Sequence, residues 1–268
     1  MDINTENKGV ALVTGASSGL GRVYADRLAK QGYDLILVAR RGDRLKEVTE
    51  SLQAKYGIKA KSLVADLSNP NDLRSVADVL STDTTITMLV NNAGIATLSP
   101  LISTEKVNVD AMNDINVTAL TELCYAVLPK FKARNIGTII NIGSVLSFYT
   151  LPISSVYSGT KGYVMNFTRG LQSEVEGSNV FVQLVLPAST ATELWDLAGI
   201  PLKNLNESTL MTAENCVDAA LAGLNQKELI TLPSVEDKAL WEAYDEARIK
   251  LFGATQNGQP ASRYQLAS

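Results

Sequence analysis

The chain has 268 residues, of which 46% are hydrophobic and 19% are charged, and its formal net charge is −4. This charge leaves no basic surface of the kind that binds nucleic acid or an anionic membrane. The sequence contains no histidine, which excludes Ser-His-Asp and Cys-His catalysis and histidine-ligated zinc. Any chemistry must therefore use Tyr, Lys, Ser, Asp, Glu or a cofactor.

The N-terminus and the cysteines predict a cytoplasmic protein without membrane partners. The opening "MDINTENKGV" lacks the basic, apolar and small-residue order of a signal peptide. No apolar run approaches the roughly 18 residues of a membrane span. Cys124 and Cys216 lie far apart and form no metal or redox spacing, so we expect buried thiols in a reducing compartment and no metal site.

Short apolar runs alternate with longer amphipathic segments through most of the chain, which is typical of βαβ units feeding a parallel sheet. Strands are predicted at 9–13, 34–38, 60–65, 86–91, 137–142, 180–185 and 228–232. Helices are predicted at 18–31, 44–56, 71–80, 104–133 and 154–176. The sequence therefore predicts an α/β fold with a doubly wound, seven-stranded, mainly parallel sheet and helices on both faces.

Two segments interrupt this alternation. Residues 187–211 form a long connection with apolar residues, and such connections often act as substrate lids. In residues 233–268 an apolar stripe predicts a C-terminal helix before a polar tail; it comprises Val235, Leu240, Tyr244, Ala247 and Leu251. Because no repeat or flexible linker divides the chain, we expect one domain over 1–268 with its core at about 8–232.

A glycine-rich loop follows the first predicted strand. The stretch "VTGASSGLG" (13–21) contains Gly15, Gly19 and Gly21 at the start of a helix. Glycines allow a tight turn and close backbone approach, and the helix N-terminus offers free N–H groups to a pyrophosphate. A plain strand-to-helix turn could use the same glycines, but the βαβ context favours a dinucleotide site that also includes Ser17, Ser18 and Leu20.

The end of the second strand indicates which dinucleotide is bound. Ala39 stands where an acid would hold the ribose diol, and Arg40 and Arg41 follow it. Guanidinium groups pair strongly with phosphate, so the sequence favours NADP(H) over NAD(H). The alternative is that both arginines are ordinary solvated charges. Asp66, next to Leu67, either accepts from the adenine amine or caps its turn.

Polar residues end the fourth and fifth strands. Asn92, Ala93 and Gly94 lie in "LVNNAG", where small residues let a cofactor pass the sheet edge, although asparagines also satisfy backbone groups in plain turns. Ser144 closes the fifth strand in "INIGS". The carboxyl ends of parallel strands are where open α/β sheets bind ligands, so both sites face the same edge.

Tyr157 and Lys161 lie four positions apart on a predicted helix, so the phenol and the ammonium share a face. A free tyrosine has a pKa near 10, and a unit charge about 4 Å away is worth roughly 4 kcal/mol at an effective dielectric constant of about 20. We therefore predict an acid–base pair. Two unrelated surface residues are the alternative for this spacing alone, but Ser144 and the glycine loop argue against it.

With these motifs the chain resembles the short-chain dehydrogenase/reductase family. TGxxxGxG, NNAG, a helical Asn, Ser and YxxxK match residues 14–21, 91–94, Asn116, Ser144 and 157–161. The resemblance implies a Rossmann fold and hydride transfer between a nicotinamide and a carbonyl or alcohol carbon. It implies that Tyr157 is the acid/base, that Lys161 lowers its pKa and binds the nicotinamide ribose, that Ser144 orients the substrate oxygen, and that Asn116 holds a relay water.

The sequence departs from the family's pattern in two places. After the sixth strand, Pro187 is followed by Ala188 where the family commonly has glycine, so we expect a tighter pocket, with Thr192 still contacting the carboxamide. The C-terminal segment also differs from the acyl-carrier-protein reductase branch, which usually ends in a Gly-rich segment.

The function predicted from the sequence is NADP(H)-dependent interconversion of a carbonyl and an alcohol on a small, apolar substrate. Apolar pocket candidates are Ile95, Leu146, Phe148, Leu151, Leu194 and Trp195, with core or lid packing as the alternative. A sugar-nucleotide epimerase or dehydratase is disfavoured by the glycine spacing, and a non-catalytic dinucleotide sensor or scaffold would lack Tyr157 or Lys161. The resemblance implies a homodimer or homotetramer that associates through the helices near 104–133 and 154–176.

Overall fold

The structure is a computed structural model that describes residues 8–264. The chain divides into two compact units, residues 1–234 and 235–268. The first unit contains the whole core expected at 8–232, and the second contains the C-terminal helix and the end of the chain. Each unit is described by itself.

The first unit is built on one parallel sheet of seven strands in the order β3-β2-β1-β4-β5-β6-β9. The strands are β1 Val10–Thr14, β2 Asp34–Ala39, β3 Ala60–Val64, β4 Ile86–Asn91, β5 Gly137–Ile142, β6 Val180–Val185 and β9 Ile230–Thr231. Every pair of neighbours is parallel. The predicted doubly wound sheet is confirmed, with a last strand shorter than expected.

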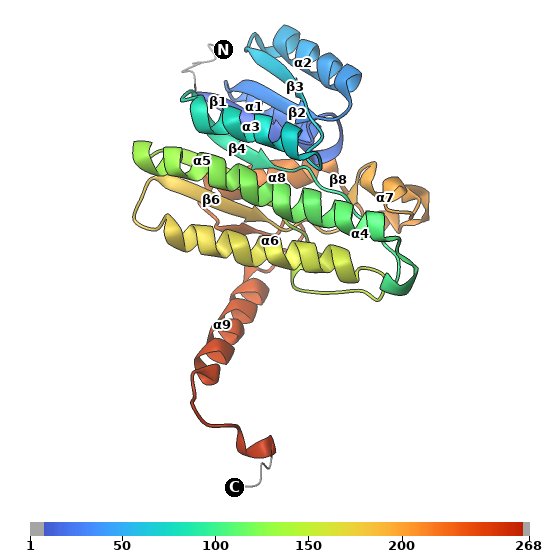
Figure 1. Ribbon diagram of the computed structural model, residues 1–268, viewed down its shortest axis with the longest axis vertical. Coiled ribbons are helices and arrows are strands. Elements are labelled where there is room, and N and C mark those ends of the chain that lie inside the picture. Colours follow the sequence, from blue (N-terminus) through green and yellow to red (C-terminus); the bar gives the residue numbers. More distant parts are fainter. Residues whose placement is uncertain (1–7, 265–268) are drawn as a thin grey trace. The chain divides into compact units, whose positions relative to one another are not determined.

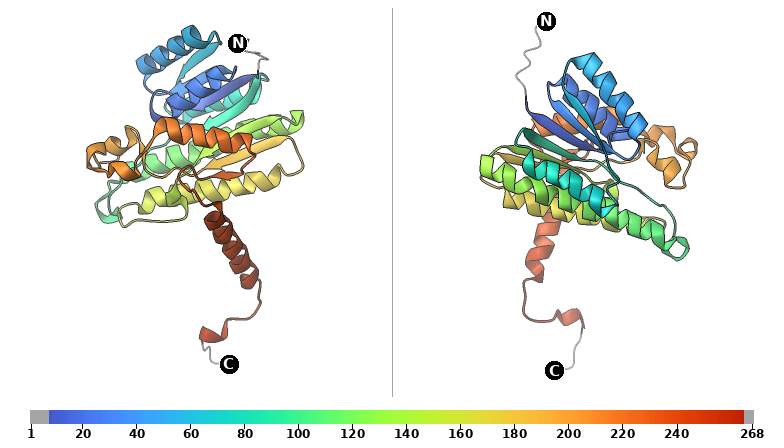
Figure 2. Two further views of the ribbon diagram at one scale, coloured as in Figure 1. Left: turned by 180° about the vertical axis from the view of Figure 1, so that it is seen from behind. Right: turned by 45° about the horizontal axis from the view of Figure 1, so that its top comes forward.

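Helices cover both faces of the sheet. They are α1 Gly19–Lys30, α2 Gly42–Tyr56, α3 Pro70–Thr82, α5 Leu120–Arg134, α6 Ser155–Glu174 and α8 Ala213–Asn225. Helices α3, α5 and α6 lie on the face seen in Figure 1, and α1, α2 and α8 lie on the opposite face, seen from behind in Figure 2. Since both faces are covered, the central strands are almost wholly apolar and buried.

The helix predicted at 104–133 is interrupted. It consists of α4 Lys106–Asn113, a π-helical segment Asp114–Ala119 and α5. A π turn accommodates one extra residue and often marks a functional site. Here the turn carries Asn116, whose side chain is buried and bonded to the loop that follows β4. A helical periodicity in the sequence does not reveal such a turn, because over so short a segment it does not distinguish the backbone hydrogen bonds of a π turn from those of an α-helix.

The connection expected as a lid at 187–211 contains short elements of its own. These are β7 Thr190–Ala191, α7 Leu194–Leu197, two 3₁₀ turns at Leu202–Asn204 and Glu207–Thr209, and β8 Met211–Thr212. Strands β7 and β8 pair in parallel, so the two ends of the segment are fastened together. The Thr212 hydroxyl then caps α8 by accepting from the backbone N–H of Asn215 at 3.1 Å. The predicted helices include no bounds for α8, although the segment around Cys216 has a helix-like pattern.

The second unit contains α9 Lys238–Thr255, as the apolar stripe predicted. Asp237 caps its start by accepting from the backbone N–H of Ala239 at 3.0 Å. None of its residues is buried, and Leu240 and Leu251 of the predicted stripe are both 68% exposed. Of the helices in residues 8–264, none has the length and apolar character to cross a membrane.

Candidate active site

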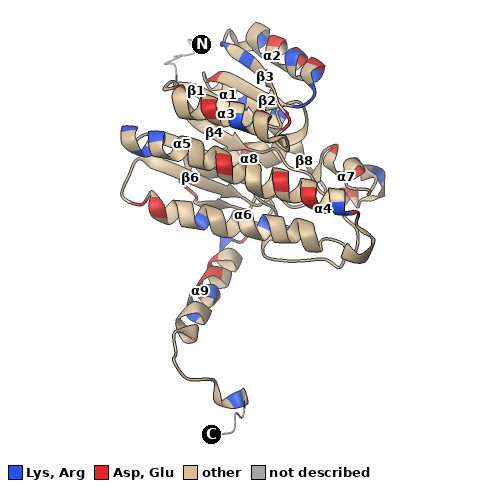
Figure 3. Cartoon of the chain, in the orientation of Figure 1, with Lys and Arg blue, Asp and Glu red and all other residues tan. Residues whose placement is uncertain are grey.

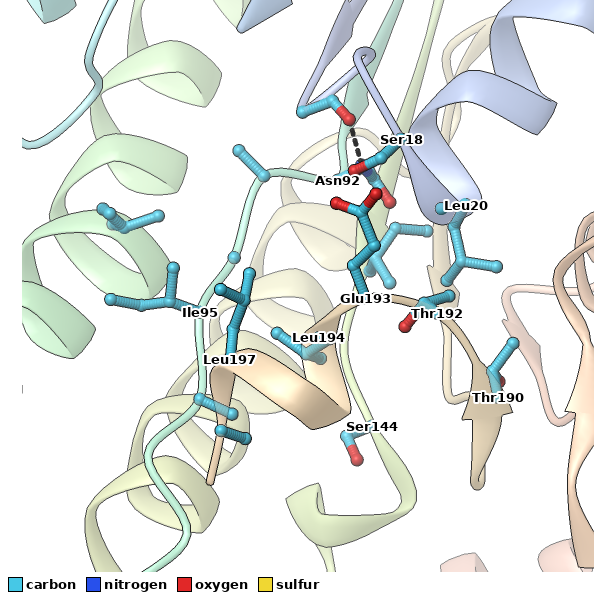
Figure 4. A pocket seen from close by; sticks show the side chains of 18 of the residues that line it. Ser18, Leu20, Asn92, Ile95, Ser144, Thr190, Thr192, Glu193, Leu194 and Leu197 are labelled. Atoms are coloured by element: carbon cyan, nitrogen blue, oxygen red, sulfur yellow. Dashed lines mark hydrogen bonds between the residues drawn. The ribbon is translucent and has the colours of Figure 1, made fainter. Parts of the chain in front are cut away.

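A cavity of about 590 Å³ lies along the carboxyl edge of the sheet. Figure 4 shows residues from the glycine loop, from the ends of β4 and β5, and from the segment around α7 arranged around it. Predicted site residues that line it are Gly15, Ser17, Ser18, Gly19, Leu20, Arg40, Arg41, Asp66, Leu67, Asn92, Ala93, Gly94, Ser144, Leu146, Tyr157, Lys161, Pro187, Thr192 and Trp195. Gly21 and Asn116 lie behind this lining. One continuous cavity therefore brings together residues from all the predicted motifs.

The glycine loop has the backbone of a phosphate cradle. Gly15 and Gly19 adopt φ values of +67° and +53°, which residues with a side chain rarely adopt. Gly21 contributes by close packing, since a Cβ there would lie 2.4 Å from the carbonyl oxygen of Gly15. Ser18 precedes α1 without a side-chain cap, and the first turn of α1 has no acidic residue. The first N–H groups of α1 are thus left for an anion.

The two arginines after β2 face different neighbours. Arg41 donates to Ser18 Oγ at 2.6 Å and to Ser17 Oγ at 3.3 Å, so it lies over the glycine loop. The guanidinium of Arg40 lies 3.9 Å from Asp66. Both side chains line the cavity. Guanidinium groups, loop hydroxyls and free helix N–H groups converge here, and this donor set fits the phosphates of a dinucleotide.

Asp66 caps its own turn. It accepts from the backbone N–H of Ser68 at 3.0 Å and from the Ser68 hydroxyl at 2.7 Å. Burial alone would raise the pKa of Asp66, but the hydrogen bonds from Ser68 and the charge of Arg40 outweigh it and hold the pKa below its ordinary value. The carboxylate is therefore ionised at neutral pH. Its contact with an adenine amine stays a prediction.

The loop after β4 is locked to β1. The Thr14 hydroxyl accepts from the backbone N–H groups of Asn92 at 3.0 Å and Ala93 at 2.9 Å, and Asn92 Nδ2 donates to the carbonyl of Thr14 at 2.9 Å. A Cβ on Gly94 would lie 3.6 Å from Lys161 Nζ. Small residues here therefore leave space between the loop and the predicted catalytic lysine.

Asn116 fastens this loop to the helices behind it. Its Oδ1 accepts from the backbone N–H of Ile95 at 2.9 Å, and its Nδ2 donates to the carbonyl of Ile95 at 2.9 Å and to Thr160 Oγ1 at 3.1 Å. The side chain thus positions the cavity wall without lining the cavity. Its relay role stays a prediction from the resemblance.

Ser144, Tyr157 and Lys161 meet at the inner end of the cavity. Burial raises the pKa of Tyr157 to about 12, and a hydrogen bond with Ser144 opposes this rise. Lys161 is 6% exposed and donates to the carbonyl of Ile142 at 2.9 Å. Burial lowers the pKa of Lys161 to about 8. Ser144 thus opposes the effect of desolvation on the phenol.

The position of Lys161 bears on its expected effect on the phenol. Its Nζ lies 5.8 Å from the centroid of the Tyr157 ring and is directed to a backbone carbonyl. Ser144 is the neighbour that lowers the Tyr157 pKa in this geometry. Lowering of that pKa by Lys161 stays a prediction.

Apolar residues line the outer part of the cavity. Ile95, Leu146, Leu151, Leu194 and Trp195 contribute as expected. Phe148 does not line the cavity, because the 3₁₀ turn after Ser144 leaves its side chain 39% exposed at the surface.

The wall around α7 is held by backbone contacts. The indole N–H of Trp195 donates to the carbonyl of Thr190 at 2.9 Å, and the N–H of Leu98 donates to the carbonyl of Ala198 at 3.1 Å. Thr192 lies against the glycine loop, since a Cβ on Gly19 would meet its methyl group at 3.3 Å.

Ala188, which stands where the family commonly has glycine, lines the cavity. Among the described non-glycine residues, positive φ occurs only at Asn135 and Lys227, so Ala188 has ordinary backbone geometry.

Glu193 is a site residue that the sequence analysis missed. It contacts Arg41 and Arg44, which precede it by about 150 positions, through hydrogen bonds of 2.7 Å each. Glu193 also lines the cavity. Its only sequence signal is its position directly after Thr192, which does not reveal an ion pair across the fold.

Known proteins share both the sequence pattern and the structure. A family model described as "short chain dehydrogenase" matches residues 9–199. A solved short-chain dehydrogenase from Sphingobium yanoikuyae in complex with NADPH is 41% identical, with a TM-score of 0.93 over 96% of this chain and 99% of its own. A bulky-bulky ketone specific alcohol dehydrogenase from Comamonas testosteroni is 34% identical, with a TM-score of 0.88 over 96% and 99%.

Curated relatives match over a shorter range. The very-long-chain 3-oxoacyl-CoA reductase of Rattus norvegicus is 34% identical over 191 residues, and reductase-B of Danio rerio is 32% identical over 188. Each alignment covers 69% of this chain, and the chain spans about 60% of the length of these relatives. The family model and the arrangement of the cavity agree, and the chain belongs to the short-chain dehydrogenase/reductase family.

Proposed function

We propose that the protein is an NADP(H)-dependent reductase of apolar ketones, or dehydrogenase of the matching alcohols, with Tyr157 as its acid/base. The observation that carries this proposal is that Ser144, Tyr157 and Lys161 line the same cavity as the glycine loop and Arg41. The bound nicotinamide supplies or accepts hydride.

The chain's own residues supply the proton and the orientation. Tyr157, protonated at neutral pH with a pKa of about 12, is an acid that can donate its proton to the oxygen of a reduced carbonyl. The Ser144 hydroxyl is a second donor for that oxygen, and donors fixed in advance stabilise developing negative charge. Lys161 would hold the nicotinamide ribose hydroxyls, and the apolar wall around Trp195 excludes water.

Loss of an arginine would reveal the choice of cofactor. Arg40→Ala or Arg41→Ala is expected to reduce the ratio of NADPH to NADH affinity by about tenfold, because a charged hydrogen bond to phosphate contributes roughly 1.5–3 kcal/mol. Dissociation constants from the quenching of Trp fluorescence measure the ratio. Arg74→Ala, an exposed arginine on α3, is the matched control. If both arginine variants keep the parental ratio, the phosphate assignment is wrong.

The outer cavity supports a bulky apolar substrate. Its walls carry Leu146, Leu151, Leu194 and Trp195, and the apolar part lies beside Ser144. The similar alcohol dehydrogenase from Comamonas testosteroni is described as specific for bulky-bulky ketones. A ketone with a large group on each side is therefore the substrate class that we propose.

A panel of carbonyl compounds tests the enzymatic proposal. With NADPH, ketones bearing two bulky apolar groups are expected to cause a fall in absorbance at about 340 nm, and the matching alcohols with NADP⁺ a rise. Small polar ketones are expected to react more slowly, because they leave the apolar wall unfilled. Tight NADPH binding without turnover of any compound would instead favour a dinucleotide sensor or scaffold.

We propose that the protein self-associates as a homodimer or homotetramer through α5 and α6. Tyr125 on α5 is 77% exposed, and the hydroxyls of Thr121 and Tyr163 link α5 to α6 at 2.9 Å. The ring of Tyr163 stacks on Phe167. Figure 3 shows acidic and basic residues interspersed along these helices, with no basic tract for nucleic acid. Light scattering at several protein concentrations measures the assembly.

A further inference from the structure

Glu193 joins the two ends of the active site. It directly precedes α7, whose residues Leu194 and Trp195 line the substrate part of the cavity. Its carboxylate reaches the opposite end, where Oε2 accepts from Arg41 and Oε1 accepts from Arg44, each at 2.7 Å. In Figure 4 it lies close to Ser18 and Leu20 of the glycine loop.

The same guanidinium that holds Glu193 is a candidate phosphate ligand. Arg41 also donates to the hydroxyls of Ser17 and Ser18, and these hydroxyls belong to the glycine loop. The carboxylate therefore occupies a position among donors that suit a doubly charged phosphate oxygen group. Hydrogen bonds from Arg41 and Arg44 hold the pKa of Glu193 below its ordinary value, so it is an anion at neutral pH.

We propose that Glu193 is an internal competitor of the cofactor's 2′-phosphate, and that this competition sets the preference for NADPH over NADH. This inference rests on the proposed use of NADP(H). When the 2′-phosphate pairs with Arg41, Glu193 gives up that ion pair, and the segment that begins α7 loses one of its two anchors at this end. NADH has no 2′-phosphate and leaves the ion pair intact.

The exposure of these side chains determines how large the expected change in cofactor affinity is. The side chains of Arg41, Arg44 and Glu193 are 41%, 51% and 47% exposed, so water screens their ion pairs. Such an exposed pair contributes at most roughly 1 kcal/mol, so removing the competitor for Arg41 corresponds to an affinity gain of up to about fivefold. The gain is selective, because only the phosphorylated cofactor uses the freed guanidinium.

The test compares Glu193→Gln with the parent for four probes: NADPH, NADH, 2′-phosphoadenosine 5′-phosphate and adenosine 5′-phosphate. Affinity of Glu193→Gln for the two 2′-phosphorylated probes is expected to rise about two- to fivefold, with less than a twofold change for the others. Glu47→Gln is the matched control, since Glu47 lines a neighbouring polar groove together with Glu193 and its loss changes the net charge equally.

Three outcomes overturn the competition: unchanged NADPH affinity, weaker NADPH binding, or an equal gain for NADPH and NADH in Glu193→Gln. A gain of the same size in Glu47→Gln also overturns it, because the effect would then come from net charge. If the parent protein itself binds NADPH no more tightly than NADH, the proposed cofactor fails first, and this result is seen without any variant.

Discussion

Tyr157→Phe is expected to lower kcat/KM for ketone reduction by about 10²–10⁴-fold while leaving NADPH affinity nearly unchanged, because the variant loses only the proton donor. Tyr157 lines the cavity together with Ser144, and desolvation raises the pKa of its phenol to about 12, so the phenol carries its proton at neutral pH. Phe preserves the ring and its packing. The measurement is steady-state NADPH oxidation with a ketone that the parent reduces.

Tyr149→Phe provides the control for this loss. Tyr149 lies in the same connection between β5 and α6 but is 66% exposed and does not line the cavity. Its replacement is expected to leave turnover within about twofold, in line with the small effects of most surface substitutions. Near-parental turnover in Tyr157→Phe would refute the proposed acid. Loss of NADPH binding in that variant would show that the tyrosine acts through the cofactor site.

Lys161→Met is expected to raise the free energy of unfolding by about 2 kcal/mol at pH 7 while reducing turnover at least about a hundredfold. The buried ammonium has its pKa lowered from 10.5 to about 8. This shift is a destabilisation of the charged form in the folded state, worth about 1.4 kcal/mol per pKa unit. The lost hydrogen bond to the carbonyl of Ile142 offsets roughly 1 kcal/mol of the gain.

The pH dependence of stability distinguishes the removal of a buried charge in Lys161→Met from the general stabilisation that a more hydrophobic side chain brings. Below pH 8 the lysine is charged in both states and the full destabilisation is present. Between about pH 8 and 10.5 the unfolded chain binds more protons than the folded one, so the parent gains stability as the pH rises. Above about pH 10 the raised pKa of Tyr157 acts in the opposite direction. The advantage of Lys161→Met should therefore shrink between pH 8 and 10.

Urea unfolding of the cofactor-free protein at pH 7 and pH 9.5 measures both quantities. Lys61→Met is the matched control. Lys61 is exposed on β3, so its ammonium is hydrated in the folded protein and its removal is not expected to increase stability. A Lys161→Met variant that is no more stable than the parent at pH 7 would contradict the expectation. So would a stability difference that stays constant between the two pH values.

The sequence predicted the sheet because each central strand is an apolar run bounded by polar segments. That pattern is typical of strands covered on both faces, and it holds for β1, β2, β4, β5 and β6 but not for the edge strand β3, which is mostly exposed. The periodicity did not reveal the π turn at 114–119, since so short a segment does not distinguish π-helical from α-helical backbone hydrogen bonds. The predicted helices also omitted bounds for α8, although Thr212 is a suitable N-terminal cap and the segment around Cys216 has a helix-like pattern.

The site was predictable where its residues lie close together in the sequence. The glycine loop and the Tyr157–Lys161 spacing are local patterns with a physical meaning. The ion pair between Glu193 and Arg41 joins two segments that lie far apart in the sequence. No pattern in the residues next to either of them predicts this contact. The contact of Lys161 with the carbonyl of Ile142 was likewise hidden, because backbone groups carry no sequence signal.

The pairing of β7 with β8 has a consequence for how this protein can diversify. The segment between Ala191 and Met211 begins and ends at adjacent points, because β7 and β8 are paired. The entropy cost of closing such a loop increases only slowly with the number of residues in it. Insertions, deletions or a transplanted segment from a relative can then be accepted without moving the sheet or the catalytic groups. The fold thus separates the part that can be re-engineered for new substrates from the part that must stay fixed.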